Sequence, residues 1–278
     1  MTEQILLVIA VPLLLAFFLP VMAHRCKLTP LLPPLVLLGL LWLLGRIWLQ
    51  HSEAAFAVAI GGFAAPLGIV FYVDQMALLF ALSVSAMTLI LWPWQSALQG
   101  QARGREMALY MLLVAACSGL ALSGDLFNLF VFYELVAVVS YGLIITRPTG
   151  VAYVAAFRYL LLSAMGSVLA LLGIAIVYFL AGSLTLAHLA TQTEVLHTPL
   201  GLSAFVFMLL GFGVKAEMFP VNSWVPEVYQ ASHRRVAALL AGLVSKLAVL
   251  IILKVLLMLY PLAAAAQLLL LLGLAGGI

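Results

Sequence analysis

The chain has 278 residues, of which 67% are hydrophobic and 8% are charged. Soluble domains average about 25% charged residues, so this composition excludes a soluble globular protein and predicts a polytopic membrane protein. The formal net charge of +3 comes without the basic clusters that a nucleic-acid-binding surface requires, which argues against a nucleic-acid partner.

The first apolar run, Ile5–Met22, is long enough to cross a bilayer as a helix. Its basic neighbours, Arg25 and Lys27, follow the run, whereas a cleaved signal peptide carries its positive charge before the apolar segment. We therefore expect the first helix to be retained.

A second apolar run, Leu28–Leu49, leads into a stretch that glycine and proline divide into short alternating segments. This punctuation is typical of a loop or a β-hairpin. We expect this stretch to form an extracytoplasmic loop up to Val73.

Six further apolar segments have about the 20 residues that a helix needs to cross the hydrocarbon core. They cover residues 74–94, 106–123, 126–145, 155–181, 199–219 and 236–260. A last apolar run starts at Leu262. The predicted fold is therefore an all-α, polytopic transmembrane helix bundle with eight complete spans and a partial ninth.

Basic residues orient this predicted bundle. If successive loops alternate across the membrane, eight of the nine basic residues outside span interiors lie on one side, namely Arg25, Lys27, Arg103, Arg105, Arg147, Arg158, Arg234 and Arg235. Only Arg46 lies on the other side. Because basic loops favour the cytoplasm, we expect an extracytoplasmic N-terminus and a location in the inner (plasma) membrane of the cell.

Two lysines lie inside apolar sequence. Lys215 belongs to the run that begins at Pro199, and Lys246 lies near the middle of the run 236–260. A charge near the bilayer centre costs roughly 2.5 to 3.5 kcal/mol on insertion scales, so an ionisable residue at that depth is a functional candidate. Pro220 interrupts the predicted seventh helix, and broken backbone at membrane depth is tolerated only inside protein or beside a watery cavity. A broken helix beside a buried lysine indicates an ion path.

Glu134 is the acid nearest to mid-membrane, nine residues after Asp125 and thirteen before Arg147. A buried carboxylate either takes up a proton or pairs with a cation, and both states suit a proton relay. The alternative is an ion pair that only fixes helix packing. Glu217 lies two positions after Lys215, so on a helix the two side chains would face nearly opposite sides and each would need another partner.

Two further residues are candidates for the point where protons enter or leave. Lys254 follows Lys246 by eight residues on roughly the same helix face; it either extends a line of lysines or reaches the interface with its ammonium group. His233 lies where a cytoplasmic loop meets the next helix, and its near-neutral titration suits proton uptake. The alternative is a solvated loop histidine. For His188 and His197, which flank an outer loop, we favour no functional role.

Other kinds of site find no support. The sequence has no GxGxxG, phosphate-loop, CxxC or HExxH motif, and the His-Arg-Cys triplet at 24–26 has too few neighbouring ligands to hold a metal. Cys26 and Cys117 lie far apart, which indicates neither a disulfide framework nor a metal knuckle. We expect no metal, no cofactor and no redox chemistry in this chain.

Several segments carry a family resemblance. They are FYVDQMALLF at Asp74, YELVAVVSYGLI around Glu134, FRYLLLSAMGSVLALLGIAIVYFLAGSLTL around Arg158, KAEMFPVNSWVPEVY from Lys215 and SKLAVL around Lys246. Together they resemble the proton-conducting antiporter-like membrane subunits. This family includes the large proton-pumping subunits of respiratory complex I, the large subunits of multi-subunit sodium/proton antiporters, and relatives in membrane-bound hydrogenases.

The resemblance implies a proton relay. In the family, a glutamate on the fifth helix pairs with a lysine on the broken seventh, and a lysine or histidine on the eighth passes the proton on. By position these are Glu134, Lys215 and Lys246. The resemblance also implies other membrane subunits as partners, including a homologous antiporter-like subunit, and protons as the transported ion, with sodium as a further candidate.

The resemblance also divides the chain. Residues 1–73 are expected to form an N-terminal two-helix segment with an extracytoplasmic loop, 74–260 the proton-conducting antiporter-like core, and 261–278 a partial ninth span. Family members have about fourteen helices in two inverted repeats, and this sequence matches the first repeat. We therefore expect either that the rest lies on another polypeptide or that the sequence is a fragment.

Two functions remain open at this point. In the first, the chain is a membrane subunit of a proton-translocating respiratory or cation/proton antiporter complex; it is not catalytic alone, but belongs to the proton-translocating part of such a complex, of the NADH:quinone oxidoreductase or hydrogenase type. In the second, it is a truncated structural subunit that anchors partners without conducting protons. Three costly ionisable groups favour the first, because a packing subunit gains nothing from them.

Overall fold

A computed structural model describes residues 2–25, 28–50, 55–60, 68–96 and 98–276 of the chain. Cys26, Lys27 and parts of the predicted outer loop lie outside the described residues. Most described residues are helical, which confirms a helix bundle in the coarse sense.

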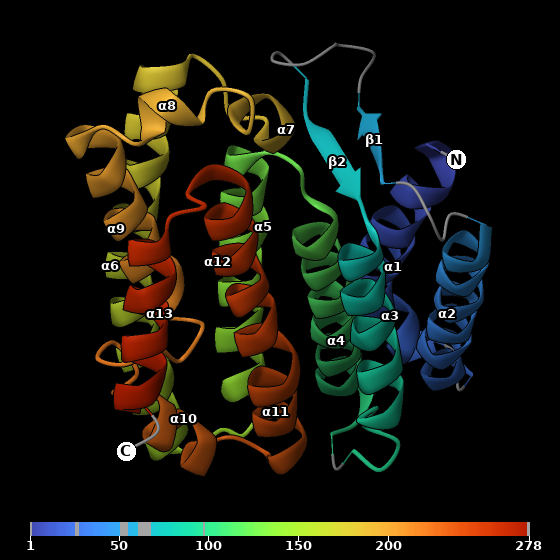
Figure 1. The fold of residues 1–278 in the computed structure, drawn as a ribbon. Helices are drawn as coiled ribbons and strands as arrows, with labels where there is room; N and C mark the ends of the chain where they lie inside the picture. The colour runs from blue at the N-terminus through green and yellow to red at the C-terminus, as the bar shows by residue number, and fades with distance from the viewer. Residues whose placement is uncertain (1, 26–27, 51–54, 61–67, 97, 277–278) are drawn as a thin grey trace.

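The long helices run along a common direction and reverse from one to the next (Figure 1). They are α1 (Thr2–Arg25), α2 (Leu32–Gln50), α3 (Gln75–Ile90), α4 (Gly100–Leu122), α5 (Leu126–Ile144), α6 (Gly150–Ala181), α9 (Pro199–Gly213), α12 (Ser245–Leu259) and α13 (Ala263–Gly276). Shorter elements connect them: α7 (Leu186–Leu189), α8 (Thr193–Leu196), α10 (Val225–Ala231), α11 (Arg234–Leu239), a π-helical turn (Leu240–Val244) and a 3₁₀ turn (Thr29–Leu31).

Six of the described helical segments are long enough and apolar enough to cross a membrane. They are α1, the segment Thr29–Gln50 that ends with α2, α4, α5, α6 and the continuous segment Arg234–Leu259 that ends with α12. The helices α3, α9 and α13 are also apolar but have only 16, 15 and 14 residues. The count of eight spans and a partial ninth exceeds these six and remains a prediction.

Capping side chains set several helix ends. The carboxylate of Asp125 accepts hydrogen bonds from two N–H groups at the start of α5, and the hydroxyls of Thr149 and Thr198 accept one each at the starts of α6 and α9. Pro199 opens α9, where its missing N–H costs no helical bond. Gly182 ends α6 with a φ of 64°, a left-handed conformation that glycine adopts without strain.

The strands β1 (Phe56–Ala59) and β2 (Val70–Val73) pair in antiparallel fashion, which confirms the hairpin that the glycine and proline pattern allowed. The hairpin, α7 and α8 lie at one end of the bundle (Figure 1), which we call the hairpin end. The α3–α4 and α5–α6 connections and α10 lie at the opposite end.

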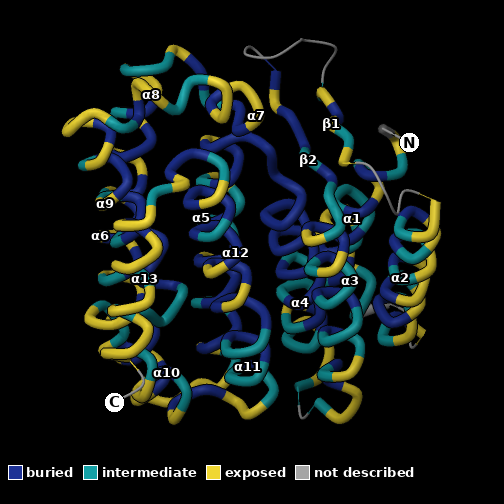
Figure 2. Tube along the Cα trace, in the orientation of Figure 1, coloured by how far each residue is buried: buried dark blue, intermediate teal, exposed yellow. Residues whose placement is uncertain are grey.

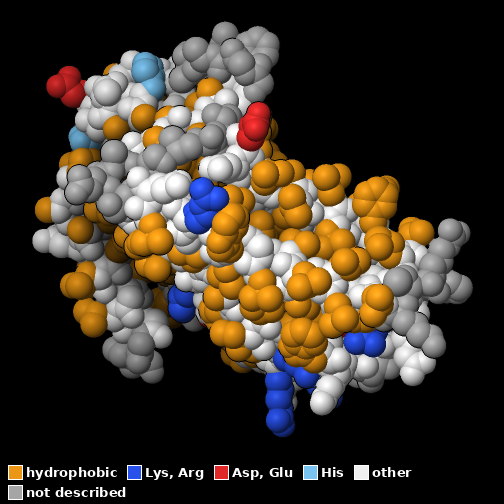
Figure 3. Space-filling view, turned by 90° about the vertical axis from the view of Figure 1, so that its right-hand side faces the viewer, with side chains coloured by type: hydrophobic (Ala, Val, Ile, Leu, Met, Phe, Trp, Pro, Cys, Tyr) orange, Lys and Arg blue, Asp and Glu red, His pale blue; other side chains and the backbone are white. Residues whose placement is uncertain are grey.

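The main core lies among α4, α5, α6, α9 and α12, and buried residues of α1, α2 and α3, such as Leu19, Leu37 and Val84, join it. Buried residues line the inner faces of α4, α5 and α12, whereas α2 and α13 are exposed along much of their length (Figure 2). Large apolar side chains also remain exposed, such as Phe17 on α1, Trp42 on α2 and Phe179 on α6. Figure 3 shows hydrophobic side chains over most of the face that it presents. This surface suits a lipid environment and contacts with other apolar helices.

Candidate functional site

The predicted pair of Glu134 and Lys215 meets inside the bundle. Glu134 lies on α5, and Lys215 lies two residues beyond the end of α9. The Nζ of Lys215 is 3.2 Å from Oε1 of Glu134. These two residues are 81 positions apart in sequence, and they come together because α6 packs against both α5 and α9.

Burial differs between the two partners. The side chain of Lys215 is only 1% exposed, whereas that of Glu134 is 37% exposed. Glu134 is therefore less buried than the sequence predicted. The hydroxyl of Ser167 on α6 hydrogen-bonds to Oε1 of Glu134. The carboxylate thus has contacts from two neighbouring elements.

Tyr133 provides two more contacts for the ammonium group. Its carbonyl oxygen accepts a hydrogen bond from Lys215 at 2.9 Å, and its ring centre lies 3.2 Å from Nζ, in the range of a cation–π contact. The Tyr133 hydroxyl also donates to the carbonyl of Gly211 on α9 at 2.7 Å. Tyr133 was missed at the sequence level, although its position next to Glu134 was a signal.

This geometry supports two protonation states. With the proton on Lys215, the two groups form an ion pair; with the proton on Glu134, both are neutral. A hydrogen bond of 3.2 Å between the two atoms permits transfer without a large movement. The Ser167 hydroxyl and the Tyr133 carbonyl remain as fixed polar partners in both states.

The helix that leads to Lys215 ends earlier than the sequence predicted. We expected the interruption at Pro220, but α9 ends at Gly213 and α10 begins at Val225. Turns fill the interval; the indole of Trp224 donates to the carbonyl of Val214 at 3.0 Å, and the Phe219–Pro220 peptide bond is cis.

Lys246 does not join the first pair. It lies on α12 directly after the π-helical turn, and it is exposed on the surface of the bundle instead of buried. An apolar run in the sequence shows that a helix crosses the membrane but not which of its faces is covered. Within the described residues, Lys246 interacts electrostatically with Glu217.

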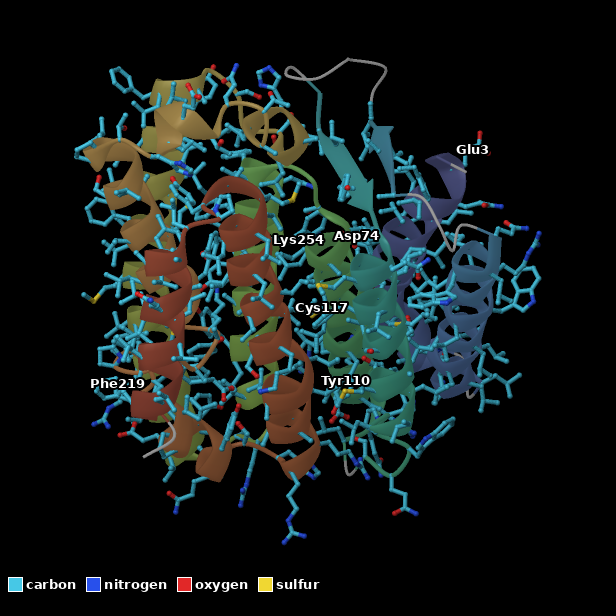
Figure 4. All side chains as sticks on the ribbon, viewed as in Figure 1. Glu3, Asp74, Tyr110, Cys117, Phe219 and Lys254 are labelled. Atoms are coloured by element: carbon cyan, nitrogen blue, oxygen red, sulfur yellow. The ribbon has the colours of Figure 1, made fainter. Side chains whose placement is uncertain are left out.

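Lys254 is buried within the bundle. Its side chain is 6% exposed, and its Nζ donates to the carbonyl of Ala121 at 2.7 Å and to that of Ser123 at 3.4 Å. Lys254 lies on α12, and Asp74 caps the start of α3. Figure 4 shows both residues toward the hairpin end. The ammonium group therefore lies inside the protein, at the end of α4, and its role in a line of lysines stays a prediction.

His233 caps a helix at the end opposite the hairpin. It is exposed, and its Nδ1 accepts a 3.4 Å hydrogen bond from the N–H of Arg235 at the start of α11. This contact gives His233 a structural role at the start of α11, and proton uptake at His233 stays a prediction.

Nearer the hairpin, burial raises the pKa of the Asp125 carboxyl. The N–H donors of Asn128 and Phe127 act in the opposite direction and lower this pKa.

Fold and site together define a multi-pass membrane protein with an acid–base pair inside a helix bundle. The family model for the membrane region of NADH:quinone oxidoreductase and Mrp antiporter subunits matches residues 123–278. The chain belongs to this family.

Individual relatives agree with this assignment. A Na(+)/H(+) antiporter subunit of Alkalihalophilus pseudofirmus is 28% identical over 256 residues, which are 90% of this chain and 51% of that protein. A chain of the membrane-bound sulfane sulfur reductase, an archaeal respiratory membrane complex, has a TM-score of 0.88 at 27% identity over 96% of this chain and 56% of its own. A chain of the Mrp complex from a Dietzia species has a TM-score of 0.84 at 26% identity over 94% of this chain and 50% of its own. The chain spans about half the length of the curated relatives it matches.

Proposed function

We propose that this chain is a membrane subunit of a proton-translocating complex, of the respiratory or the cation/proton antiporter type, and that it passes protons through Glu134, Lys215 and Lys246. The observation that carries the proposal is the Lys215–Glu134 pair, with its 3.2 Å separation and its 1% exposed lysine. Residues this costly to bury in a membrane mark ion paths in general.

In this proposal, α9, the non-helical residues 214–224 and α10 form one interrupted transmembrane helix, the seventh. Together with α3, it raises the number of spans from six to eight, and α13 is the ninth. The interruption supplies irregular backbone beside Lys215, which membrane proteins tolerate where it is enclosed by protein or lines a path for ions.

The proposed relay starts with the pair. A proton that arrives at Glu134 neutralises the carboxylate and releases Lys215 from its partner. Lys215 then passes its proton on toward Lys246, and in this proposal the two lysines alternate in carrying it. His233 and Lys254 are the candidates for the ends of the path.

The test removes the charge of Lys215. We expect Lys215→Met to lower proton translocation by roughly 100-fold, the contribution typical of a positioned acid or base, in the complete complex reconstituted into liposomes with a pH-sensitive dye inside. Arg46→Gln is the matched control, because it removes an exposed positive charge on α2 and should translocate at the parent rate.

The second candidate function, a structural subunit that anchors its partners, makes the opposite prediction. In that case Lys215→Met would affect assembly or thermal stability but not the proton flux per assembled complex. A parent-like flux in this variant would therefore refute the relay and favour anchoring.

The proposed partners follow from the relatives and the surface. The relatives named above are subunits of multi-subunit membrane complexes, and the apolar face in Figure 3 offers area for other membrane subunits, including a homologous antiporter-like subunit. Sodium is the proposed counter-ion if the complex is of the antiporter type, as the name of the Alkalihalophilus relative states for that protein.

A further inference from the structure

Glu217 adopts a backbone conformation that side-chain-bearing residues avoid. Its φ is 58°. Among the described residues other than glycine, Glu217 is the one with a positive φ. Such a conformation costs of order 1 to 3 kcal/mol and persists where the surrounding structure fixes it, often at functional sites.

A hydroxyl group from another element holds the carboxylate. The Tyr229 hydroxyl on α10 donates a hydrogen bond to Oε1 of Glu217. The sequence suggested that Glu217 needs a partner other than Lys215, and Tyr229 is that partner.

Glu217 also lines a pocket of 440 Å³ between the interrupted segment, α12 and α13. Among the lining residues in the described part of the chain, Glu217 is the titratable one, and the others are apolar residues or glycines, such as Phe219, Val249, Leu253 and Leu269. A carboxylate in such an apolar pocket requires a counter-charge or a proton.

The helix α12 places that counter-charge nearby. Val249 and Leu253, which line the pocket, follow Lys246 by three and seven residues, so the three side chains lie on one face of the helix. Lys246 is therefore one turn from the pocket, and it interacts electrostatically with Glu217. The π-helical turn Leu240–Val244 directly precedes this face, and such turns frequently occur at functional sites.

We propose that Glu217 is the counter-ion of Lys246, held in place by the Tyr229 hydroxyl, and that the two form a second acid–base pair on the far side of the interruption from Glu134 and Lys215. The proton moves from the ammonium of Lys246 through water in the pocket to the carboxylate of Glu217, which leaves a neutral amine and a carboxylic acid, and it returns by the reverse step. This inference rests on the proposed function, to which it adds a fourth proton-carrying residue.

The two pairs are mechanically linked. Only Ala216 separates Lys215 from Glu217 in the chain, so a backbone change that moves the lysine also moves the carboxylate. Protonation of one pair thus alters the geometry of the other, without any contact between Lys215 and Lys246.

The experiment uses a hydrophobic carbodiimide, which reacts with protonated carboxyl groups, on the full chain in its complex. The pH at half-maximal labelling of Glu217 is measured by mass spectrometry of the peptide that contains it, and Glu217→Gln confirms the site. We expect Lys246→Met to raise this pH by about one unit or more, because loss of a nearby positive charge favours the protonated acid. Lys246→Arg, which keeps the charge, should leave it unchanged.

The groups that face Glu217 are Tyr229 from α10 and Lys246 from α12, while α13 carries no titratable residue. Tyr229→Phe therefore provides a second, milder test and should also raise the labelling pH. Equal labelling pH in Lys246→Met and Lys246→Arg would overturn the pair. That outcome together with loss of flux in Lys215→Met would leave the proposed function intact, whereas a shifted labelling pH with parent-like flux in Lys215→Met would keep the pair and refute the function.

Discussion

Lys254 is a cation at the carbonyl end of another helix. α4 ends at Leu122, and its last carbonyl groups have no partner within the helix. The ammonium of Lys254 donates to the carbonyl groups of Ala121 and Ser123 there, and the negative end of the helix dipole favours a positive charge at this place. At the scale of single residues, Lys254 therefore joins α12 to α4.

Replacement of Lys254 by Met should lower the thermal midpoint of the purified protein. The expected cost is roughly 1 to 3 kcal/mol, because buried carbonyl groups lose their donors. Fluorescence-detected gel filtration after heating measures the midpoint. Leu257→Met, on an exposed position of the same helix, is the control; equal midpoints for the two variants would contradict this role.

The sequence predicted some of these residues better than others. Glu134 and Lys215 could be singled out because each is an ionisable residue inside an apolar run, and the family resemblance implied that they pair. The exposure of Lys246 and the burial of Lys254 could not, because both lie in the same run and only packing decides which face of α12 is covered. Glu217 was noticed but left without a partner, since the expected helix continued through it.

Small residues allow close contact between α6 and α9. A Cβ added to Gly211 would lie 2.5 Å from the carbonyl oxygen of Gly166 and 2.6 Å from the amide nitrogen of Ala170. Such approach of two backbones is the usual way in which membrane helices pack. The Gly211 carbonyl also accepts a hydrogen bond from the Tyr133 hydroxyl, so this position contacts both α6 and α5 four residues before Lys215.

Gly211→Val should separate α9 from α6 and destabilise the fold by more than about 1 to 3 kcal/mol, the usual cost of overpacking. The measurement is again the thermal midpoint in detergent. Gly39→Val, at a position on α2 where an added Cβ meets nothing within 4 Å, is the control and should change the midpoint little.

If Gly211→Val retained the parent midpoint, the close contact would not be a determinant of stability.

The start of α9 was predictable from Pro199, but its end was not. Apolar residues continue to Phe219, and the hydrophobic pattern cannot show that the chain leaves the helix at Gly213 to bring Lys215 to α5.

The connections between the long helices lie at the two ends of the molecule. α4 and α6 begin at the end opposite the hairpin, whereas α8 lies at the hairpin end (Figure 1). The sequence analysis predicts that the end where α4 and α6 begin faces the cytoplasm, because basic loops favour that side. Orientation in the membrane itself remains a prediction.

Single cysteines at Gly100 and Gly150 should resist a membrane-impermeant maleimide added to intact cells, while one at Thr193 should react. The physical reason is the excess of basic residues in the loops near the first two positions. The background replaces Cys26 and Cys117 by alanine, and permeabilised cells provide the control. Labelling at position 150 from outside would reverse the orientation.

The hairpin end is closed by the main chain. The N–H of Gly124 donates to Val70, that of Leu126 donates to Leu184, and that of Leu186 donates back to Gly124, each at 2.9 Å. Every residue except proline carries the peptide groups that make these bonds. Apart from Gly124, where an added Cβ would lie 2.7 Å from that of Tyr72, side chains at this closure can therefore change without opening it, and distant homologues can share the closure while sharing few of its residues.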